Sequence, residues 1–504
     1  MMKRFNTTGL CVPKKHYMVD ISNKLDDIEK LVDNEAYFVI NRPRQFGKTT
    51  TLNELYKRLK NKYIVIKLDF ERMSEDFASS KIFCNSFVKS LSMALGEDFK
   101  EVDTLNNLAY LISDITKDKD IVLMIDEVDR ISNNQLFVNF LGILRSLYLD
   151  REAELTTTFK SVILAGVYDI KNLKLKFSDN TDTRYNSPWN IAVDFDINMS
   201  FNINEIETML IEYNLNNNLD MDTRKISKEI YKFTNGYPFL VSRLCQIIDE
   251  KILKDNKRIW EVKDIYKAVK LILTEHNTLF DDLIKNLENN RELKEFMFNI
   301  IMNGEEKSFN IHNKTISIGS MFGYFKQLNY KVSISNLIFS EVLYNYFASK
   351  VEEQVEIAPY NLKSNFTTQT GLDFKKILLR FQQFIKEQYS TLDSKFIERE
   401  GRLLFLAFIK PIINGVGFDF KEVQVSEEKR LDIVVTYLKE KYLVELKIWR
   451  GEEYHEKGLK QLYDYLEIED LDIGYLLVFN FNKNKEYSSK EYKIKNKSIF
   501  EVFV

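Results

Sequence analysis

Hydrophobic positions in the first 200 residues form two kinds of pattern along the chain. Short continuous apolar runs predict buried strands, and the longer stretches between them have the spacing of amphipathic helices. Because helical segments separate successive strands, we expect the strands to run parallel in a sheet that is covered on both faces. The predicted strands are 36–40, 63–68, 121–125 and 161–165, with helices at 49–59, 80–115 and 139–149. This part of the chain is therefore predicted to be of the α/β class.

The pattern changes again after residue 202. Helical spacing fills the next segment and is broken at the sequence Asn-Gly-Tyr-Pro that ends at Pro238. Further on, two alternating segments, 315–318 and 330–334, predict a β-wing on a small helical module. A polar, irregular stretch then predicts a linker, and two helices, a hairpin, a helix and a final strand follow it. The predicted domains are 1–202, 203–285, 286–352, the linker 353–370 and 371–504.

Composition narrows the class of protein. With 72 Lys and Arg against 75 Asp and Glu, the formal net charge is −3, which excludes a uniformly basic chain and confines any nucleic-acid surface to a local patch. Three scattered cysteines and four histidines exclude a disulfide scaffold and a Cys/His zinc cluster. The apolar runs are too short for a membrane span, and the N-terminus has no apolar signal core. We therefore expect a cytoplasmic protein with no membrane partner.

A phosphate-binding loop is predicted where the first strand ends and a helix begins. Gly47, Lys48 and Thr49 match the end of the pattern G-x-x-x-x-G-K-[ST]. This chemistry needs backbone N–H groups at a helix N-terminus for the phosphates, a lysine for the β and γ oxygens, and a hydroxyl for Mg²⁺. Arg42 departs from the pattern at the first glycine, a residue that permits the unusual dihedral angles of such a loop. The predicted nucleotide contacts are Arg44, Gln45, Phe46, Gly47, Lys48, Thr49 and Thr50.

Two acidic residues at the end of a buried strand supply the other half of a nucleotide site. Asp126 is expected to hold Mg²⁺ together with Thr49, and Glu127 to orient and deprotonate the attacking water. Each motif alone has an ordinary interpretation, because a turn can start a helix and a solvated strand can end in acids. Both motifs in this order on these elements favour ATP and Mg²⁺ as ligands.

With these two motifs, residues 1–350 resemble the AAA-like and signal-transduction ATPases of the P-loop class. The resemblance implies that 1–202 is the ATPase core, 203–285 its helical lid and 286–352 a winged-helix-like module. It also implies that Pro238 contacts bound nucleotide, although a simple break between two helices remains an alternative.

The same resemblance suggests where other nucleotide-responsive residues lie. The segment 161–166 is similar to the family's sensor strand, with Tyr168 or Asp169 in place of the usual polar residue. An ATP-dependent homo-oligomer would also need an arginine finger that acts in trans. The candidates for this finger are Arg145, Arg151 and Arg184.

The C-terminal domain has a polar pattern on one strand of a predicted hairpin. The two strands of this hairpin are 430–438 and 441–449. In the second strand, Glu445 and Lys447 alternate with apolar residues, so an acid and a base lie side by side on one face. This face is therefore the candidate for chemistry.

The register of the hairpin decides whether a second acid joins that face. A two-residue connection at 439–440 places Asp432 opposite Lys447, and Val434 opposite Glu445. An odd connection without a bulge would turn Asp432 to the other face, whereas a four-residue connection would keep it. Two facing carboxylates are costly without a cation, and Mg²⁺ or Mn²⁺ prefers such oxygen ligands. Lys447 would then position a water for attack on a phosphodiester and stabilise the developing charge.

An aspartate followed by Glu-Leu-Lys on the next strand resembles the active-site pattern of the PD-(D/E)XK nuclease superfamily, which has a restriction-endonuclease-like α/β fold. The resemblance implies a third acid on the preceding helix, with Glu398 as second choice, and a polar residue on the following helix. A solvated strand face with an ordinary Glu–Lys pair remains the alternative. The predicted catalytic residues are Glu400, Asp432, Glu445, Lys447 and Gln461, with Glu400, Asp432 and Glu445 as metal ligands.

Three residues near this strand have less specific roles. Trp449 and Arg450 could stack on a base, but Trp449 is expected to close the core instead. His455 is expected to be a surface residue of a helix rather than a ligand.

Together the motifs predict an ATP-binding and ATP-hydrolysing switch that controls a Mg²⁺-dependent phosphodiesterase on the same chain. The expected partner is nucleic acid and the expected activity that of a DNA endonuclease, which by analogy between folds suits microbial defence or mobile-element biology. Two alternatives remain open. One is a non-cleaving ATP-dependent regulator with an inactive nuclease fold, and the other is a motor that processes DNA.

Overall fold

The computed structural model describes residues 3–504 except 133, 168–174, 177–183, 186–187, 255–257, 302–304, 353–365, 369–370, 390–403, 407, 410–411, 413–416, 422–423, 427–428, 431–432, 438–439, 481 and 483–484. Contacts divide the chain into two compact units. The first unit is Met1–Asn286 with Ser308–Glu341, and the second is Leu287–Lys307 with Val342–Val504. Residues of the predicted module 286–352 therefore fall in both units.

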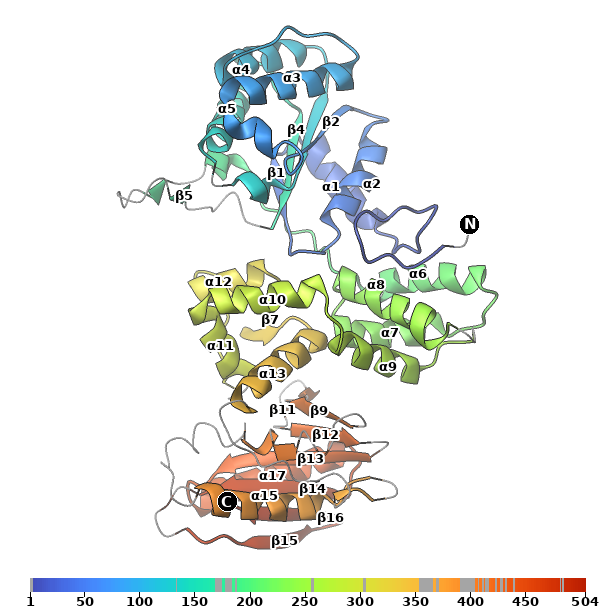
Figure 1. Ribbon diagram of the computed structural model, residues 1–504, viewed down its shortest axis with the longest axis vertical. Coiled ribbons are helices and arrows are strands. Elements are labelled where there is room, and N and C mark those ends of the chain that lie inside the picture. Colours follow the sequence, from blue (N-terminus) through green and yellow to red (C-terminus); the bar gives the residue numbers. More distant parts are fainter. Residues whose placement is uncertain are drawn as a thin grey trace. The chain divides into compact units, whose positions relative to one another are not determined.

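A four-stranded parallel sheet in the order β1-β4-β3-β2 lies at the centre of the first unit (Figure 1). Strands β1, β3 and β4 are largely apolar on both faces, as expected for a sheet with helices on both sides, whereas the edge strand β2 exposes Lys67. The strands are β1 (Phe38–Asn41), β2 (Ile64–Asp69), β3 (Ile121–Asp126) and β4 (Ser161–Gly166). Helices α3 (Ser80–Leu95), α4 (Leu105–Ile115) and α5 (Gln135–Glu152) cover one face, and α2 (Lys48–Leu59), with α1 (Ser22–Asp33) beside it, covers the other. The predicted parallel α/β core is confirmed.

The strand order positions the nucleotide motifs. Because the strands are parallel, the loops that follow β1 and β3 leave the same edge of the sheet, and β4 lies between the two strands. On the face covered by α3, α4 and α5, phenylalanine side chains pack the helices against one another. The Phe83 ring lies 4.7 Å from Phe77 and 5.1 Å from Phe140, and each such aromatic pair adds about 0.5–1.5 kcal/mol beyond its buried area. Short elements in this unit are η1 (Ser74–Ala78), η2 (Val128–Ile131), η4 (Pro188–Ile191), β5 (Leu175–Lys176) and β6 (Arg184–Tyr185).

The predicted helical segment after residue 202 begins at a capping box. The Asn202 side chain accepts from the backbone N–H of Glu205, and the Glu205 carboxylate accepts from the N–H of Asn202. Pro238 occupies the first turn of its helix, where the missing N–H costs no hydrogen bond. The helices are α6 (Ile203–Asn216), α7 (Thr223–Thr234), α8 (Pro238–Ile247) with the π-turn η5 (Ile248–Ile252), α9 (Val262–Leu273) and α10 (Thr278–Asn289).

One half of the predicted β-wing is wrong. The segment 315–318 is helical, because the Asn313 side chain accepts from the backbone N–H groups of Thr315 and Ile316 and so starts a helix. The strand that pairs with β8 (Lys331–Ile334) is instead β7 (Phe325–Leu328). The helices around this hairpin are α11 (Arg291–Ile301), α12 (Lys314–Met321) and α13 (Leu337–Glu352).

The C-terminal part of the second unit is a six-stranded mixed sheet in the order β15-β16-β14-β13-β12-β9. Helices cover both faces: α17 lies against the face that carries Leu443, and on the other face the Phe374 ring of α15 stacks on Tyr442 at 5.0 Å. This architecture agrees with the predicted restriction-endonuclease-like α/β domain. Its elements are α15 (Phe374–Tyr389), β9 (Gly417–Lys421), β10 (Gln424–Ser426), β11 (Lys429–Arg430), β12 (Ile433–Tyr437), β13 (Glu440–Ile448), α17 (Glu452–Ile468), β14 (Ile473–Phe479), β15 (Ser489–Ile494) and β16 (Lys497–Phe503).

The register of the β12–β13 hairpin differs from the prediction by two residues. Tyr437 pairs with Glu440, and Val434 lies opposite Leu443 rather than opposite Glu445. The connection is therefore 438–439 and not 439–440. Because the shift is even, no side chain changes face, and Glu445 stays on the α17 side with Leu443.

Across the part of the chain that the structure describes, no helix has both the length and the apolar character that a bilayer crossing requires.

Candidate functional site

The predicted phosphate loop joins β1 to α2 and encloses its lysine. Gly47, with φ 82°, has a left-handed conformation that glycine adopts without strain and that directs the chain into α2. The Lys48 ammonium group lies inside the loop, where it donates to the carbonyl oxygens of Arg42 at 2.9 Å and Pro43 at 3.0 Å. Burial lowers the pKa of Lys48, and the nearby carboxylates of Asp129, Glu127 and Asp126 oppose that effect.

The departure at the first glycine of the motif has a conformational explanation. Among the described loop residues, those with positive φ are Gln45, at 55°, and Gly47, whereas Arg42 has negative φ. The first position therefore does not require glycine here, and the loop accommodates a long side chain.

The two predicted acids lie at the end of β3, next to the start of α2. The Thr49 side chain is hydrogen-bonded to Asp126, whose carboxylate also accepts from the backbone N–H of Glu127 at 3.0 Å. Burial raises the pKa of Asp126, and burial together with the adjacent Asp126 charge raises the pKa of Glu127. A hydroxyl and a carboxylate in contact are the oxygen ligands that Mg²⁺ prefers, and a carboxyl group with a raised pKa is a stronger base.

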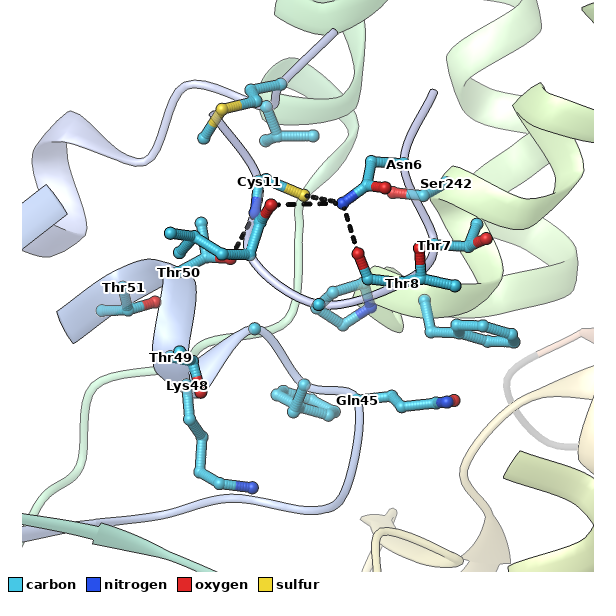
Figure 2. Close-up of a pocket in the computed structure, with 18 of the residues that line it drawn as sticks. Asn6, Thr7, Thr8, Cys11, Gln45, Lys48, Thr49, Thr50, Thr51 and Ser242 are labelled. Carbon is cyan, nitrogen blue, oxygen red and sulfur yellow. Dashed lines mark hydrogen bonds between the residues drawn. The ribbon is translucent and has the colours of Figure 1, made fainter. Parts of the chain in front are cut away.

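A cavity of about 670 Å³ opens beside the loop and α2 (Figure 2). The N-terminal segment 6–11, which the motif analysis missed, forms part of its wall. It is held there because the Asn6 amide donates to the Thr8 carbonyl at 2.8 Å and the Cys11 backbone N–H donates to the Thr50 hydroxyl at 3.2 Å. The only sequence signal for this segment is a loop-like run of small polar residues around a glycine. Other lining residues are Gln45, Phe46, Gly47, Lys48, Thr49, Glu127, Met199, Phe201, Pro238, Phe239, Ser242 and Arg243.

The helical lid contacts the phosphate loop directly. The Tyr237 hydroxyl donates to the Arg44 carbonyl at 2.6 Å, and the Tyr237 ring lies 4.8 Å from the ring of Phe46. The Gln45 amide donates to the Thr278 hydroxyl at 2.8 Å, and Arg44 forms an ion pair with Asp282 of α10. Pro238 lines the cavity and begins α8.

The remaining nucleotide-responsive candidates are the residues after the sensor strand and the arginines. Tyr168 and Asp169 lie outside the described residues, and so does the side chain of Arg184. Arg145 is half-buried and donates to the Asn190 side chain at 3.0 Å. Arg151 donates to the carbonyl oxygens of Phe159, Lys160 and Glu35 within its own domain, which argues against a role as a finger in a neighbouring protomer.

The second candidate site lies on the α17 face of β13. Glu445 is 1% exposed, and its carboxylate is 2.7 Å from the Lys447 ammonium group. Gln461 of α17 accepts from Lys447 at 3.3 Å and donates to the Tyr465 hydroxyl at 3.1 Å. A Cβ on Gly458 would lie 3.3 Å from the Lys447 chain, so a larger residue there would press on the lysine. Glu445 is therefore buried rather than solvated, and Lys447 lies between it and Gln461.

Asp432 and Glu400, with Glu398, lie outside the described residues. Within the described ranges, no group of three His, Cys, Asp or Glu side chains is arranged to hold a metal ion. Of the three predicted ligands, the structure therefore places Glu445.

His455 is not the surface residue that the sequence suggested. Its side chain is 12% exposed and its Nε2 is hydrogen-bonded to Glu501 of β16, which is buried and also accepts from the Tyr492 hydroxyl at 3.1 Å. The imidazole lies 5.5 Å from the Trp449 ring, which closes the core as expected. Glu501 is remote in sequence, so no local pattern could reveal the pair.

Comparison with known families places these two sites in context. Residues 15–349 match the AAA-like domain, and residues 414–491 match the PD-(D/E)XK nuclease superfamily. The comparison with curated proteins finds no match.

Three solved structures are similar to this chain at low sequence identity. A Walker-type ATPase of Pyrococcus abyssi is 11% identical, with 67% of this chain and 99% of that chain covered and a TM-score of 0.46. Drosophila ORC bound to DNA is 12% identical, with coverage of 67% and 88% and a TM-score of 0.33. The RuvB Holliday junction branch migration motor of Thermotoga maritima is 10% identical, with coverage of 68% and 96% and a TM-score of 0.33.

The AAA-like match covers more than half of the chain, including the phosphate loop, the two acids and the lid. The chain therefore belongs to the AAA-like family of P-loop ATPases and carries a PD-(D/E)XK nuclease-superfamily domain in C-terminal position.

Proposed function

We propose that this protein is an ATP-dependent switch that controls a Mg²⁺-dependent phosphodiesterase acting on nucleic acid, with DNA as the substrate. The ATPase half rests on the cavity beside α2 and the contact between Thr49 and Asp126. The observation that carries the nuclease half is the enclosed Glu445–Lys447–Gln461 cluster. The match of residues 414–491 to a nuclease superfamily supports the same assignment.

In the nucleotide site, the first backbone N–H groups of α2 have no partner within the helix and would bind phosphate oxygens. Lys48 would exchange its two carbonyl acceptors for the β and γ oxygens. Thr49 and Asp126 would hold Mg²⁺, which supplies positive charge to the transferred phosphoryl group. Glu127, whose pKa is raised, would take the proton of the attacking water.

The rest of the cavity is suited to a nucleoside. Met199, Phe201 and Phe239 provide an apolar lining for a base, which gains from burial and stacking on aromatic rings. Polar groups of the segment 6–11, and Ser242 beside Asn6, would contact the edge of the base (Figure 2). An organic ligand held this way contacts both the core and the lid, so its binding would fix one relative to the other.

In the nuclease site, Lys447 would orient the attacking water and stabilise the phosphate charge that develops. Its own position is set by Glu445 on one side and Gln461 on the other. Glu445 offers a buried carboxylate of the kind that binds Mg²⁺, and Asp432 and Glu400 are the proposed further ligands. The metal would supply Lewis-acid activation of the phosphodiester.

A cleavage assay on plasmid DNA, single-stranded DNA and RNA, with and without ATP, Mg²⁺ and chelator, tests this proposal. The expected result is Mg²⁺-dependent nicking of DNA by wild type that Lys447→Ala abolishes. Lys441→Ala is a matched control, because Lys441 is on the same strand but exposed and paired with Glu469. Absence of cleavage of every substrate, or equal cleavage by Lys447→Ala, would reject the nuclease half and favour a non-cleaving regulator.

A further inference from the structure

Arg42 is unusually well anchored for a residue in a phosphate loop. Its guanidinium group donates to the carbonyl oxygens of Phe195 at 3.0 Å, Ile197 at 2.7 Å and Asn41 at 3.0 Å. It also lies 4.9 Å over the Phe195 ring. The arginine fork can reach two carbonyl groups at once, which a lysine cannot do with the same geometry.

The segment that Arg42 holds is the connection between the ATPase core and the helical lid. It runs from Phe195 to Phe201, immediately before α6 begins. Met199 and Phe201 line the nucleotide cavity, and the Phe201 backbone N–H donates to the Gly236 carbonyl at 2.8 Å. We call this connection the hinge segment (195–201). It contacts the phosphate loop at one end and, at the other end, the turn between α7 and α8 (235–237), which we call the lid turn.

The backbone of Arg42 takes part in the phosphate site at the same time. Its carbonyl oxygen is an acceptor for the Lys48 ammonium group, and its N–H donates to the Gly166 carbonyl at 3.1 Å. Bound β and γ phosphates would attract Lys48 and so change the one contact that the lysine shares with Arg42. The side chain of the same residue would pass that change to the carbonyl oxygens of the hinge segment.

We propose that Arg42, at the position of the first motif glycine, is a positioning residue that couples occupancy of the phosphate site to the lid through the hinge segment. This inference rests on the proposed nucleotide function. It has a consequence opposite to what the motif suggests: Arg42→Gly, which restores G-x-x-x-x-G-K-T, weakens nucleotide binding and uncouples the lid. Glycine would remove the three carbonyl contacts and the ring contact and would add backbone freedom to the loop.

The test measures ATP affinity and hydrogen–deuterium exchange in the full chain. In wild type, saturating ATP is expected to slow exchange in the hinge segment and in the first turns of α8. In Arg42→Gly, ATP is expected to bind about tenfold more weakly, equivalent to about 1.4 kcal/mol. At saturating ATP the loop itself remains protected in this variant, but the protection of the hinge segment and α8 is lost.

Arg151→Ala is the matched control. Arg151 also donates to three backbone carbonyl groups and lies over the Tyr148 ring at 4.9 Å, but it is remote from the cavity lining. It is expected to lower thermal stability while leaving ATP affinity and lid protection as in wild type. Arg42→Lys keeps the charge without the fork, so it should retain folding and show an intermediate loss of lid protection, even if the glycine variant does not fold.

The outcomes separate the inference from the proposed function. If wild type and Arg151→Ala bind no ATP, the nucleotide function fails and the inference falls with it. If both bind ATP and Arg42→Gly and Arg42→Lys bind it as tightly with full lid protection, the coupling role of Arg42 is overturned while the nucleotide function stands. Loss of lid protection in the Arg42 variants, with wild-type behaviour of Arg151→Ala, supports the coupling.

Discussion

Gly236, in the turn before α8, is the position where the addition of a single methyl group should disturb the nucleotide site most. Its φ is 72°, a conformation that costs an L residue about 1–2 kcal/mol. A Cβ built there would lie 1.9 Å from the Phe201 carbonyl oxygen, so the two backbones would have to separate by about 1.5 Å to reach the 3.4 Å of ordinary van der Waals contact. That movement would break the hydrogen bond from the Phe201 N–H, which contributes about 1 kcal/mol.

Gly236→Ala should therefore lose about 2–3 kcal/mol of stability, as the sum of the strain and the lost hydrogen bond. Because Phe201 and Pro238 line the cavity, ATP affinity should fall as well, by about tenfold if half of that free energy is expressed in the lid–cavity geometry. Calorimetry of the full chain and titration with a fluorescent ATP analogue measure the two effects.

Gly96→Ala is the control for backbone strain alone. Gly96 has φ 68° at the end of α3, but no atom lies within 4 Å of a Cβ there. This variant should lose about 1 kcal/mol and bind ATP normally. Equal destabilisation of the two variants, or unchanged ATP affinity in Gly236→Ala, would refute the argument that the lid turn and the hinge segment are in obligatory contact.

Three further predictions concern single side chains. The His16 side chain accepts the Val12 backbone N–H at 2.9 Å, and burial, with nearby positive charges, lowers the pKa of His16 below the ordinary 6.5. The stabilising contribution of His16 is therefore complete above pH 6.5 and is lost as the pH falls through the lowered pKa. The melting temperature of wild type should show a step in this pH range that His16→Phe lacks. Asp126→Asn should retain ATP binding but slow hydrolysis, measured as phosphate release, by about a hundredfold or more, because metal-ion stabilisation is worth several kcal/mol. Hydrolysis at the wild-type rate would exclude the carboxylate as a metal ligand. Gln461→Leu should slow DNA cleavage about tenfold without loss of stability, because the amide that holds Lys447 at 3.3 Å is gone, and an unchanged rate would show that the amide does not position the lysine.

Features that depend on local order could be predicted from the sequence. Gly47, Lys48 and Thr49 lie at a strand-to-helix junction, and Asp126 ends the strand two positions away in the sheet, so their convergence follows from parallel topology. In the same way, Glu445 and Lys447 share a face because strand residues alternate, whatever the exact register of the hairpin. Period and topology were sufficient to bring these particular residues together.

Features that depend on distant partners or on weak turn signals could not be predicted from the sequence. The hairpin register was wrong by two residues because neither Lys439-Glu440 nor Leu438-Lys439 is a favoured turn pair, so the sequence contains no marker of the connection. The helix at 315–318 was mistaken for a strand because its alternation is short and the decisive cap, Asn313, lies outside it. The burial of His455 depends on Glu501, a partner 46 residues away.

The central claim, that the nucleotide site governs cleavage, is tested most directly by the ATP response of DNA nicking in wild type and in Lys48→Ala. We predict that ATP changes the Mg²⁺-dependent nicking rate of wild type by about tenfold, within the ordinary range of coupling between sites, and that Lys48→Ala does not respond to ATP at any concentration. Equal, ATP-independent nicking by both proteins would contradict the claim and assign the two domains separate activities.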